Sequence, residues 1–366
     1  MADQATARQR LTRLQGYLSV DPGNETLRAD IFYTALEAGE LDVAQAELTR
    51  ALGERADDPV WRHRRSTLFL ATKRYDEARA ALQELLDAGV NDPAIVHDLA
   101  FALFRLGHVD RAAETVLPLL DAPELRDGPA WPLWLRCMHR LEREDVGLER
   151  FRAQLALGGP SADAIGVASL MAIDAGQLAE ANVWSKTALQ RQPDHLEALV
   201  ARGTLALSAG ALQEALQYYQ RALSVSPSDG RTWSGVALVR MAFGDLPGAD
   251  EAFGRAVETM PEHVGTWIAH GWCRLLRNEP AEARRSFEEA VRRDRNLGEC
   301  HGGLAVALAR LGERDAAKRE IDLALRLEPK GLGARYAEAV LAGKAEDPDT
   351  VRKLSLMAAR AVRPSP

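Results

Sequence analysis

The sequence predicts an all-α protein, a solenoid of stacked helix pairs, and two repeated patterns are the basis for this. The first is a ladder of alanines at intervals of 34 residues: Ala44, Ala78 and Ala112, then Ala181, Ala215, Ala249, Ala283 and Ala317. The second is the recurrence of apolar residues at i, i+3, i+4 and i+7 between these alanines, which is the spacing of amphipathic helices. A fixed period of this size is typical of one supersecondary unit stacked many times.

Other residues follow the same period and mark where each helix ends. A glycine precedes the alanine by five residues in Gly39, Gly107, Gly176, Gly210, Gly244 and Gly312, where a tight turn needs a residue that tolerates positive φ. A proline follows it by twelve residues in Pro193, Pro227, Pro261 and Pro329, because proline cannot continue a helix. We expect the aromatic residues four places after the alanine (Tyr219, Phe253 and Phe287) to fill the space beside it.

These markers resemble the tetratricopeptide repeat, whose pattern has Trp, Leu, Gly and Tyr in a first helix, then Ala, Phe, Ala and Pro. The best unit, Gly230 to His263, has Trp233, Val236, Ala237, Ala249, Phe253, Ala256 and Pro261 at the matching places. The resemblance implies a right-handed superhelix in which the first helix of each unit lines a concave groove. In this family the groove holds peptides or partner helices.

We count nine units, beginning near residues 25, 59, 93, 128, 162, 196, 230, 264 and 298. The predicted domains are an N-terminal capping helix (1–24), four degenerate repeats (25–161), five better-matched repeats (162–331), and C-terminal capping helices with a tail (332–366). The unit near Gly128 fits least well, because Gly147 replaces the alanine and the stretch LLDAPELRDGPA holds one extra residue. A bend or a junction is expected there.

Composition and charge exclude several classes of function. The 366 residues carry a net charge of −7, which does not favour a general attraction to nucleic acid. The N-terminus lacks the apolar core of a signal peptide, and no segment is apolar enough to span a membrane. Three scattered cysteines (Cys137, Cys273 and Cys300) form no disulfide or zinc framework. We therefore expect a cytoplasmic protein with no cofactor, no metal, no membrane contact and no nucleic-acid partner.

The family resemblance places positions 2, 5, 6, 9, 12 and 13 of each unit in the groove. In the second to fourth units these positions hold cations interleaved with phenylalanines, which suit a partner with acidic and apolar side chains. The alternative is a solvated cationic face whose phenylalanines pack into the next repeat. The candidates are His63, Arg64, His97, Phe101, Phe104, Arg105, Arg136, His139 and Arg140.

In the fifth to eighth units the same positions are apolar. They could dock an amphipathic helix, with tryptophan as an anchor residue, or a tight superhelix could bury them against neighbouring helices. We expect Trp233 and Trp267 to be core residues, because they occupy the structural tryptophan position of the family. The apolar groove candidates are Leu238, Met241 and Trp272, with Leu170, Ile173, Val200, Leu207, Ile268 and Leu275 beside them.

No constellation of residues predicts catalysis. Glu299, Cys300 and His301 are adjacent, so on a helix they point in different directions and cannot form a nucleophile–base pair by themselves. The small residues Gly302 and Gly303 are expected to permit close helix packing. An enzyme would need scattered groove residues such as His97 and His139, and nucleic-acid binding would rely on the arginines alone.

The favoured function is a scaffold, adaptor or assembly chaperone that binds a protein or peptide partner in its groove. The groove lysine and asparagine set with which some family members grip chaperone C-termini is missing, and so is the asparagine ladder of glycosyltransferase repeats. The alternative is a structural repeat protein that assembles with copies of itself. The sequence leaves the oligomeric state open.

Overall fold

The computed structural model describes residues 2–158 and 160–343 of the chain. Within these residues the protein consists of twenty α-helices and two short 3-10 helices, without a strand. This confirms the all-α prediction. After α1, the helices α2 to α19 follow one another as nine pairs, and α20 comes after them. Where both helices of a pair belong to one unit, they pack against each other, as α10 does with α11 and α14 with α15.

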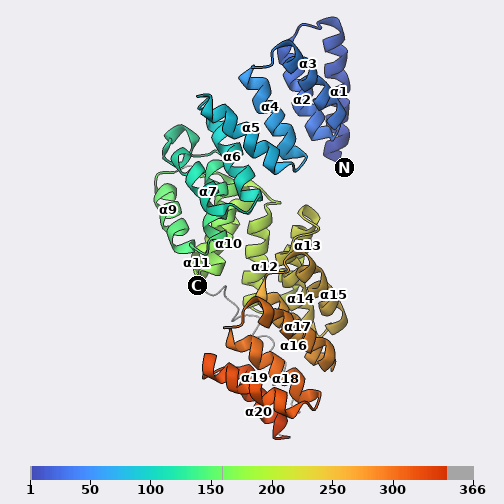
Figure 1. Cartoon of the computed structure of the whole chain (residues 1–366), viewed down its shortest axis with the longest axis vertical. Helices are drawn as coiled ribbons and strands as arrows, with labels where there is room; N and C mark the ends of the chain where they lie inside the picture. The colour runs from blue at the N-terminus through green and yellow to red at the C-terminus, as the bar shows by residue number, and fades with distance from the viewer. Residues whose placement is uncertain (1, 159, 344–366) are drawn as a thin grey trace. The chain divides into compact units, whose positions relative to one another are not determined.

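The chain divides into two compact units. Unit 1 comprises residues 1–143 and 154–161, and unit 2 comprises residues 144–153 and 162–366. The helices of each unit run back and forth one after another (Figure 1). The predicted domain boundary between residues 161 and 162 remains a prediction. Unit 1 contains α1 (Ala2–Val20), α2 (Glu25–Ala38), α3 (Leu41–Glu54), α4 (Pro59–Ala71), α5 (Tyr75–Asp87), α6 (Pro93–Arg105), α7 (Val109–Val116), η1 (Leu117–Asp121), η2 (Pro123–Leu125) and α8 (Ala130–Arg140).

The helices of unit 2 begin where the repeat predicts them. Those after α9 (Glu144–Ala156), which contributes residues to both units, are α10 (Ala162–Asp174), α11 (Leu178–Arg191), α12 (Leu196–Ser208), α13 (Leu212–Val225), α14 (Gly230–Phe243), α15 (Leu246–Thr259), α16 (Val264–Leu276), α17 (Pro280–Arg293), α18 (Gly298–Arg310), α19 (Arg314–Leu327) and α20 (Leu332–Leu341). Of the closing helices predicted in 332–361, α20 is the first, and residues 344–366 lie outside the described chain.

The alanine ladder lies in the buried contacts of eight of the nine pairs. All eight ladder alanines are completely buried. The aromatic residue four places after the ladder alanine packs against glycines of the adjoining first helices. In unit 2, a Cβ on Gly203 of α12 would lie 2.6 Å from the ring of Tyr219, and one on Gly235 of α14 would lie 2.4 Å from it. Phe287 is enclosed in the same way by a glycine of α16 and one of α18. The sequence therefore leaves room in the first helices for the aromatic residue of the second.

The turn between the two helices of a pair requires a left-handed residue. The six period-matched glycines have φ between 71° and 85°. Three units lack this glycine, and there Lys73, Glu142 and Asn278 adopt φ of 60°, 55° and 60°. These are the non-glycine residues with positive φ in the described chain. The repeat geometry thus imposes the left-handed turn even where the residue disfavours it.

N-caps provide a further period that the sequence analysis missed. Asn24, Asp58 and Asp92 precede their first helices at intervals of 34 residues and accept backbone N–H groups through their side chains. In unit 2, His195, Asp229 and His263 repeat the interval and the capping contact. The signal was present in the sequence, since these residue types stand directly before each predicted helix start.

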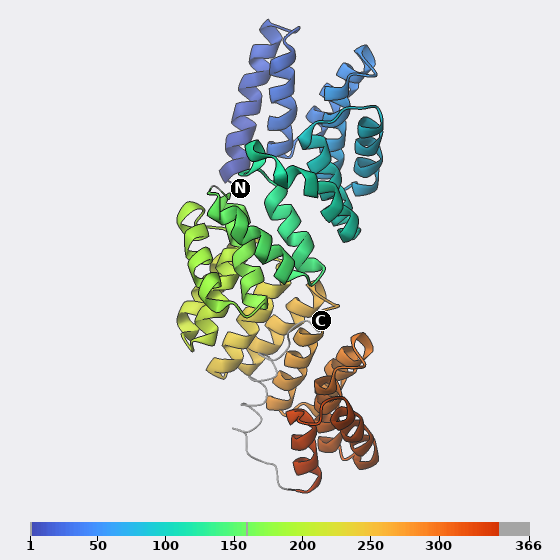
Figure 2. The ribbon, with the colours of Figure 1, turned by 90° about the vertical axis from the view of Figure 1, so that its left-hand side faces the viewer.

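The N-terminal helix α1 packs on α2. The two helices lie side by side at the N-terminal, dark blue end of the ribbon (Figure 2). Ala7 and Leu11 of α1 are buried in a cluster with Ile31 and Phe32 of α2. In this way α1 buries apolar side chains of the first helix pair, and its role as a capping helix stays a prediction.

We expect Lys73→Gly to stabilise the chain by about 1 kcal/mol, because a left-handed backbone costs a non-glycine residue roughly that amount. Urea unfolding followed by circular dichroism measures the effect as a higher midpoint. The neighbouring Thr72 has a φ of −90°, so Thr72→Gly is the matched control and should lower the midpoint. A midpoint for Lys73→Gly below that of the wild type would contradict the prediction.

Candidate functional site

Unit 1 carries a row of arginines and aromatic rings on its first helices. The guanidinium carbon of Arg64 on α4 lies 4.4 Å from the ring centroid of Trp61. That of Arg105 on α6 lies 5.9 Å from Phe101 and 4.8 Å from Tyr75 at the start of α5. That of Arg140 on α8 reaches across to α6, 5.4 Å from Phe104. We call Arg64, Phe101, Phe104, Arg105 and Arg140 the arginine–aromatic face.

The arginines of this face have no counter-ion in the part of the chain that the structure describes. Among the described residues, no carboxylate lies within ion-pair distance of Arg64, Arg105 or Arg140. Other arginines of unit 1 differ: Arg62 pairs with Glu84 at 3.1 Å, and Arg74 pairs with Glu77 at 2.6 Å. Because stacking occupies only the flat side of a guanidinium, the N–H groups at its edge remain available for a fork-like contact with an anion.

The charge of the first helices is strongly one-sided in this part of unit 1. Helices α4, α6 and α8 together contain six arginines and a single carboxylate, Asp98. In unit 2, helices α10, α12, α14, α16 and α18 contain five arginines and four carboxylates. The chain as a whole is acidic, with a net charge of −7. The positive charge of α4, α6 and α8 is therefore a local feature.

Two of the predicted groove histidines are engaged by Asp98. His63 Nε2 lies 2.8 Å from one oxygen of Asp98, and His97 Nδ1 lies 3.3 Å from the other. Burial alone would raise the pKa of Asp98, but the hydrogen bonds from His63 and His97 outweigh it and hold that pKa below its usual value. His63 thereby ties α4 to α6, whereas His97 lies on α6 beside Asp98. Asp98 was missed in the sequence, although its offset of 35 residues from His63 was a usable signal.

The remaining two candidates of unit 1, Arg136 and His139 on α8, are half-buried. Each is already in contact with another group of the chain. Of the nine predicted residues, Arg105 and Arg140 are therefore the cations that are both exposed and without an internal carboxylate among the described residues. Phe101 and Phe104 lie under them, half-exposed. Any role of these residues in binding stays a prediction.

The apolar positions of unit 2 are mostly core. Trp272 and Ile268 are completely buried, and Met241 retains 2 % of its surface. Trp272 packs against Phe287 and against Tyr336 of α20, with ring centroids 5.7 Å and 6.4 Å away. Trp272 and Met241, taken above as docking candidates, are therefore not accessible to a partner. Leu238, Leu207 and Ile173 keep part of their surface, and Val200, Leu170 and Leu275 are buried.

Such groove candidates of unit 2 are covered because first helices two repeats apart contact each other. Tyr336 of α20 reaches Trp272 of α16 past α18. Likewise, Arg231 at the start of α14 donates to Asp174 at the end of α10, with one N–O distance of 2.7 Å, although the two are 57 residues apart. Several of the predicted groove positions of unit 2 are thus occupied by contacts within the chain. No local sequence pattern indicates contacts of this range.

Glu299 of α18 lies beneath α20. The Trp272 indole N–H donates to its carboxylate at 3.3 Å, and a Cβ on Gly333 would lie 3.3 Å from the same oxygen. Burial raises the pKa of Glu299 to about 7, with a further contribution from the negative charge of Glu328. Next to it, Gly302 of α18 approaches the backbone of Gly333 so closely that a Cβ would lie 2.8 Å from the following backbone nitrogen. Close packing at Gly302 is confirmed.

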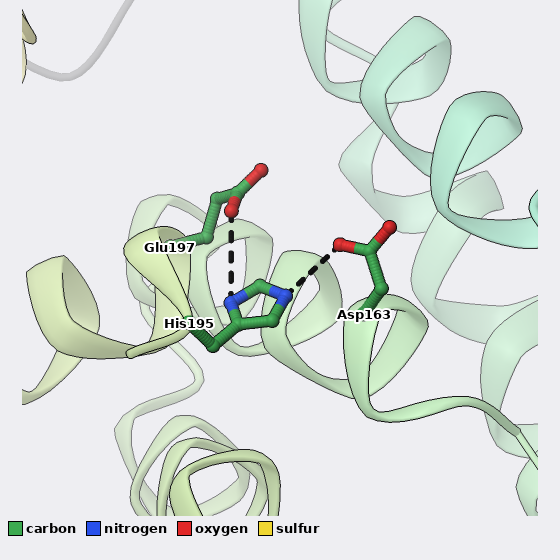
Figure 3. A group of neighbouring side chains, drawn as sticks. All are labelled: Asp163, His195 and Glu197. Atoms are coloured by element: carbon green, nitrogen blue, oxygen red, sulfur yellow. Dashed lines mark hydrogen bonds and ion pairs between the residues drawn. The ribbon is translucent and has the colours of Figure 1, made fainter. Parts of the chain in front are cut away.

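A cluster of Asp163, His195 and Glu197 in unit 2 has the residue types of a metal site (Figure 3). His195 Nε2 lies 2.9 Å from Asp163, and its Nδ1 lies 3.6 Å from Glu197. However, Nδ1 also accepts the backbone N–H of Ala198 at 3.3 Å, as the N-cap of α12. The proton of the neutral ring must then be on Nε2, where it donates to Asp163. Neither nitrogen has a lone pair left for a metal, so the cluster is a helix cap tied to α10.

The three cysteines are buried. Burial raises the pKa of Cys137, Cys273 and Cys300 to about 12 each, so none forms a thiolate near neutral pH. His301 is occupied by Glu320 at 2.7 Å and by the backbone oxygen of Arg295 at 3.0 Å. His301 therefore ties α18 to its neighbours and has no contact that would make it a base for Cys300.

Comparison with known families matches the repeat in both units. One family model of the tetratricopeptide repeat matches residues 69–125, and a second matches residues 30–93 and 170–230. No curated protein matches the chain. Proteins of this superfamily generally mediate protein–protein interactions and are typically scaffolds without enzymatic activity. In the described part of this chain, no helix is both long and apolar enough to cross a membrane.

Solved structures of tetratricopeptide repeat proteins are similar to the chain at low identity. One from Parabacteroides merdae is 15% identical, with 68% of this chain and 97% of that chain covered and a TM-score of 0.45. The pilF protein of Pseudomonas aeruginosa is 22% identical, with 56% and 93% covered and a TM-score of 0.45. YrrB, described as having an unusual peptide-binding site, is 15% identical, with 62% and 98% covered and a TM-score of 0.37.

Glu299→Gln should stabilise the chain above pH 7 and change little at pH 5. The pKa of Glu299 rises from 4.5 to about 7 on folding, so the folded state favours the protonated acid. The wild type therefore loses stability as the pH rises from about 4.5 through about 7, on the order of 1–3 kcal/mol. Melting temperatures between pH 5 and pH 8 measure this. Glu328→Gln, which removes the second cause, should give a smaller gain, and parallel profiles for wild type and Glu299→Gln would refute the prediction.

His195→Ala should lower the free energy of unfolding by about 1–2 kcal/mol, because α12 loses its cap and the space beside Gly166 is emptied. His195→Asn should lose less, because asparagine caps α2 in the same way at position 24. Urea unfolding of the two variants gives the comparison. Added zinc or a chelator should leave the melting temperature of the wild type unchanged. Stabilisation by zinc that disappears in His195→Asn would show that the cluster is a metal site after all.

Proposed function

We propose, from the premise that this chain belongs to the tetratricopeptide repeat superfamily, that it is a non-enzymatic scaffold or adaptor. It holds a segment of a partner protein on the arginine–aromatic face of unit 1. The observation that carries the proposal is the presence of exposed, stacked guanidinium groups on consecutive first helices without a counter-ion in the described chain. Guanidinium groups and aromatic rings are also the groups that most often dominate the energy of protein interfaces.

The contrast between the two units supports this location. A partner can bind only where groups are reachable, and in unit 2 Trp272 is covered by Tyr336 while Arg231 is paired with Asp174. On α6, Phe101 and Phe104 keep part of their surface and carry the guanidiniums of Arg105 and Arg140. An aromatic base with a cationic rim offers both apolar contact and directed hydrogen bonds. Adaptor and assembly chaperone are both roles that such a face can serve.

Stacking also lowers the entropic cost of binding. An arginine side chain free in water loses much rotamer entropy when a partner immobilises it. Arg64, Arg105 and Arg140 already rest on rings, at 4.4 Å, 4.8 Å and 5.4 Å from the nearest centroid. Part of the ordering cost is therefore met by folding. This preorganisation favours the face as a recognition surface over an arbitrary patch of solvated arginines.

The double variant Phe101→Ala with Phe104→Ala should bind the natural partner at least about tenfold more weakly, because it removes the apolar base of the face. Co-purification with mass spectrometry identifies the partner, and titration calorimetry with the purified partner measures the affinity. The matched control is Leu178→Ala with Val183→Ala on α11, which removes apolar side chains that are 48% and 58% exposed in unit 2. This control should bind like the wild type.

Hydrogen exchange locates the bound partner independently of the variants. Protection in the presence of partner should appear in α4, α6 and α8. Protection restricted to helices of unit 2, or loss of binding in the α11 control but not in the phenylalanine variant, would count against the proposal. Melting curves of each variant verify that an altered affinity does not come from unfolding.

A further inference from the structure

We propose that the partner segment is acidic and that Arg105 and Arg140 bind two of its carboxylates as a pair. This inference rests on the proposed function and specifies the chemistry of its ligand. It starts from the placement of the two guanidiniums over the same helix. Arg105 belongs to α6 and lies over Phe101, whereas Arg140 belongs to α8 and lies over Phe104. Phe101 and Phe104 are three residues apart on α6 and so share one side of it, about one turn apart.

Two like charges brought over one helix repel each other unless an anion lies between them. The chain does not provide one in the part that the structure describes. Asp98 is the single carboxylate of α6, and it is shared between His63 and His97. Helix α8 contains no acidic residue at all. The arrangement is therefore electrostatically incomplete until a ligand supplies negative charge.

The geometry also selects the kind of anion. The ring against each guanidinium leaves its N–H edge open, and this edge matches a carboxylate in a fork. Nucleic acid is a poorer fit, since proteins that bind single strands use free aromatic faces for stacking bases. Here Phe104 and Phe101 are each already covered by an arginine. An acidic protein segment with apolar side chains between its carboxylates satisfies both the arginines and the half-exposed rings.

The repeat explains why the two arginines act together. Arg105 and Arg140 occupy the same position of consecutive units, 35 residues apart because of the inserted residue. Consecutive first helices are in contact, as α6 is with α8. Arg140 extends from α8 to Phe104 of the preceding unit, so both guanidiniums lie over rings of α6. Two carboxylates of the partner can contact the N–H edges of both Arg105 and Arg140 better than a single residue can.

The test uses a fluorescently labelled synthetic peptide of alternating glutamate and phenylalanine, and its analogue with glutamine in place of glutamate. Fluorescence anisotropy with the full chain should detect the glutamate peptide, and raising the salt from 50 to 200 mM should weaken its binding. Arg105→Gln and Arg140→Gln should each reduce the affinity by about tenfold, the loss of one charge-assisted contact. The glutamine analogue should bind like the weakest variant.

Arg74→Gln is the matched control. Arg74 also stacks on a phenylalanine of unit 1, with its guanidinium carbon 4.5 Å from the ring centroid of Phe69, but it is neutralised by Glu77 at 2.6 Å. Its replacement should change the affinity by less than about twofold, within the usual range for an exposed pair. A loss in Arg74→Gln equal to that in Arg105→Gln would mean that general positive charge, not the unpaired arginines, attracts the peptide.

The other outcomes of the peptide titrations also test whether Arg105 and Arg140 bind carboxylates. No binding of the glutamate peptide, equal binding of the glutamine analogue, or unchanged affinity in both arginine variants would overturn the inference. Displacement of the peptide by an oligothymidylate at lower concentration than by unlabelled peptide would assign the arginines to nucleic acid instead. The proposed function is tested separately, by the affinity of the double variant Phe101→Ala with Phe104→Ala for the natural partner.

Discussion

The close approach of two helices at a buried alanine is the constraint on which both units depend. Each helix pair is too small to enclose a core of its own, so it buries its apolar side chains against the next pair. The completely buried ladder alanines allow this approach, and the ring of Tyr219 or Phe287 then fits against glycines of the adjoining first helices. The position of every first helix follows from these contacts. The side chains that the first helices present are thereby fixed as well.

The same framework serves two purposes in the two units. In unit 1 the helices α4, α6 and α8 present stacked arginines, and the single carboxylate of these three helices, Asp98, is shared by two histidines. In unit 2 the corresponding positions hold the chain together, through the buried Trp272 and through the ion pair of Arg231 with Asp174. A repeat position therefore has no function of its own. Its role depends on whether the next helices leave it open or cover it.

Polar side chains, and histidines above all, connect neighbouring elements in both units. His63 joins α4 to α6 through Asp98, His195 joins the start of α12 to α10 through Asp163, and His301 joins α18 to Glu320 of α19. Each of these rings is half-buried or buried. A polar ring inside an apolar stack is costly unless both nitrogens find partners, so these contacts favour one register of packing over others. The groups that look most reactive in the sequence thus have structural partners.

The sequence by itself determined the helices, their turns and their pairing, because these depend on contacts within one unit of 34 residues. Glycine, proline and alanine at fixed offsets are sufficient for that, and even the chain at Lys73 follows the turn that the other units predict. It also placed Arg105 and Arg140 among the candidates. Only the tertiary structure decided which candidates are open, because Trp272 is covered by α20 two repeats later and Arg231 reaches Asp174 across 57 residues. Contacts of that range depend on how tightly successive pairs turn, and no local pattern encodes it.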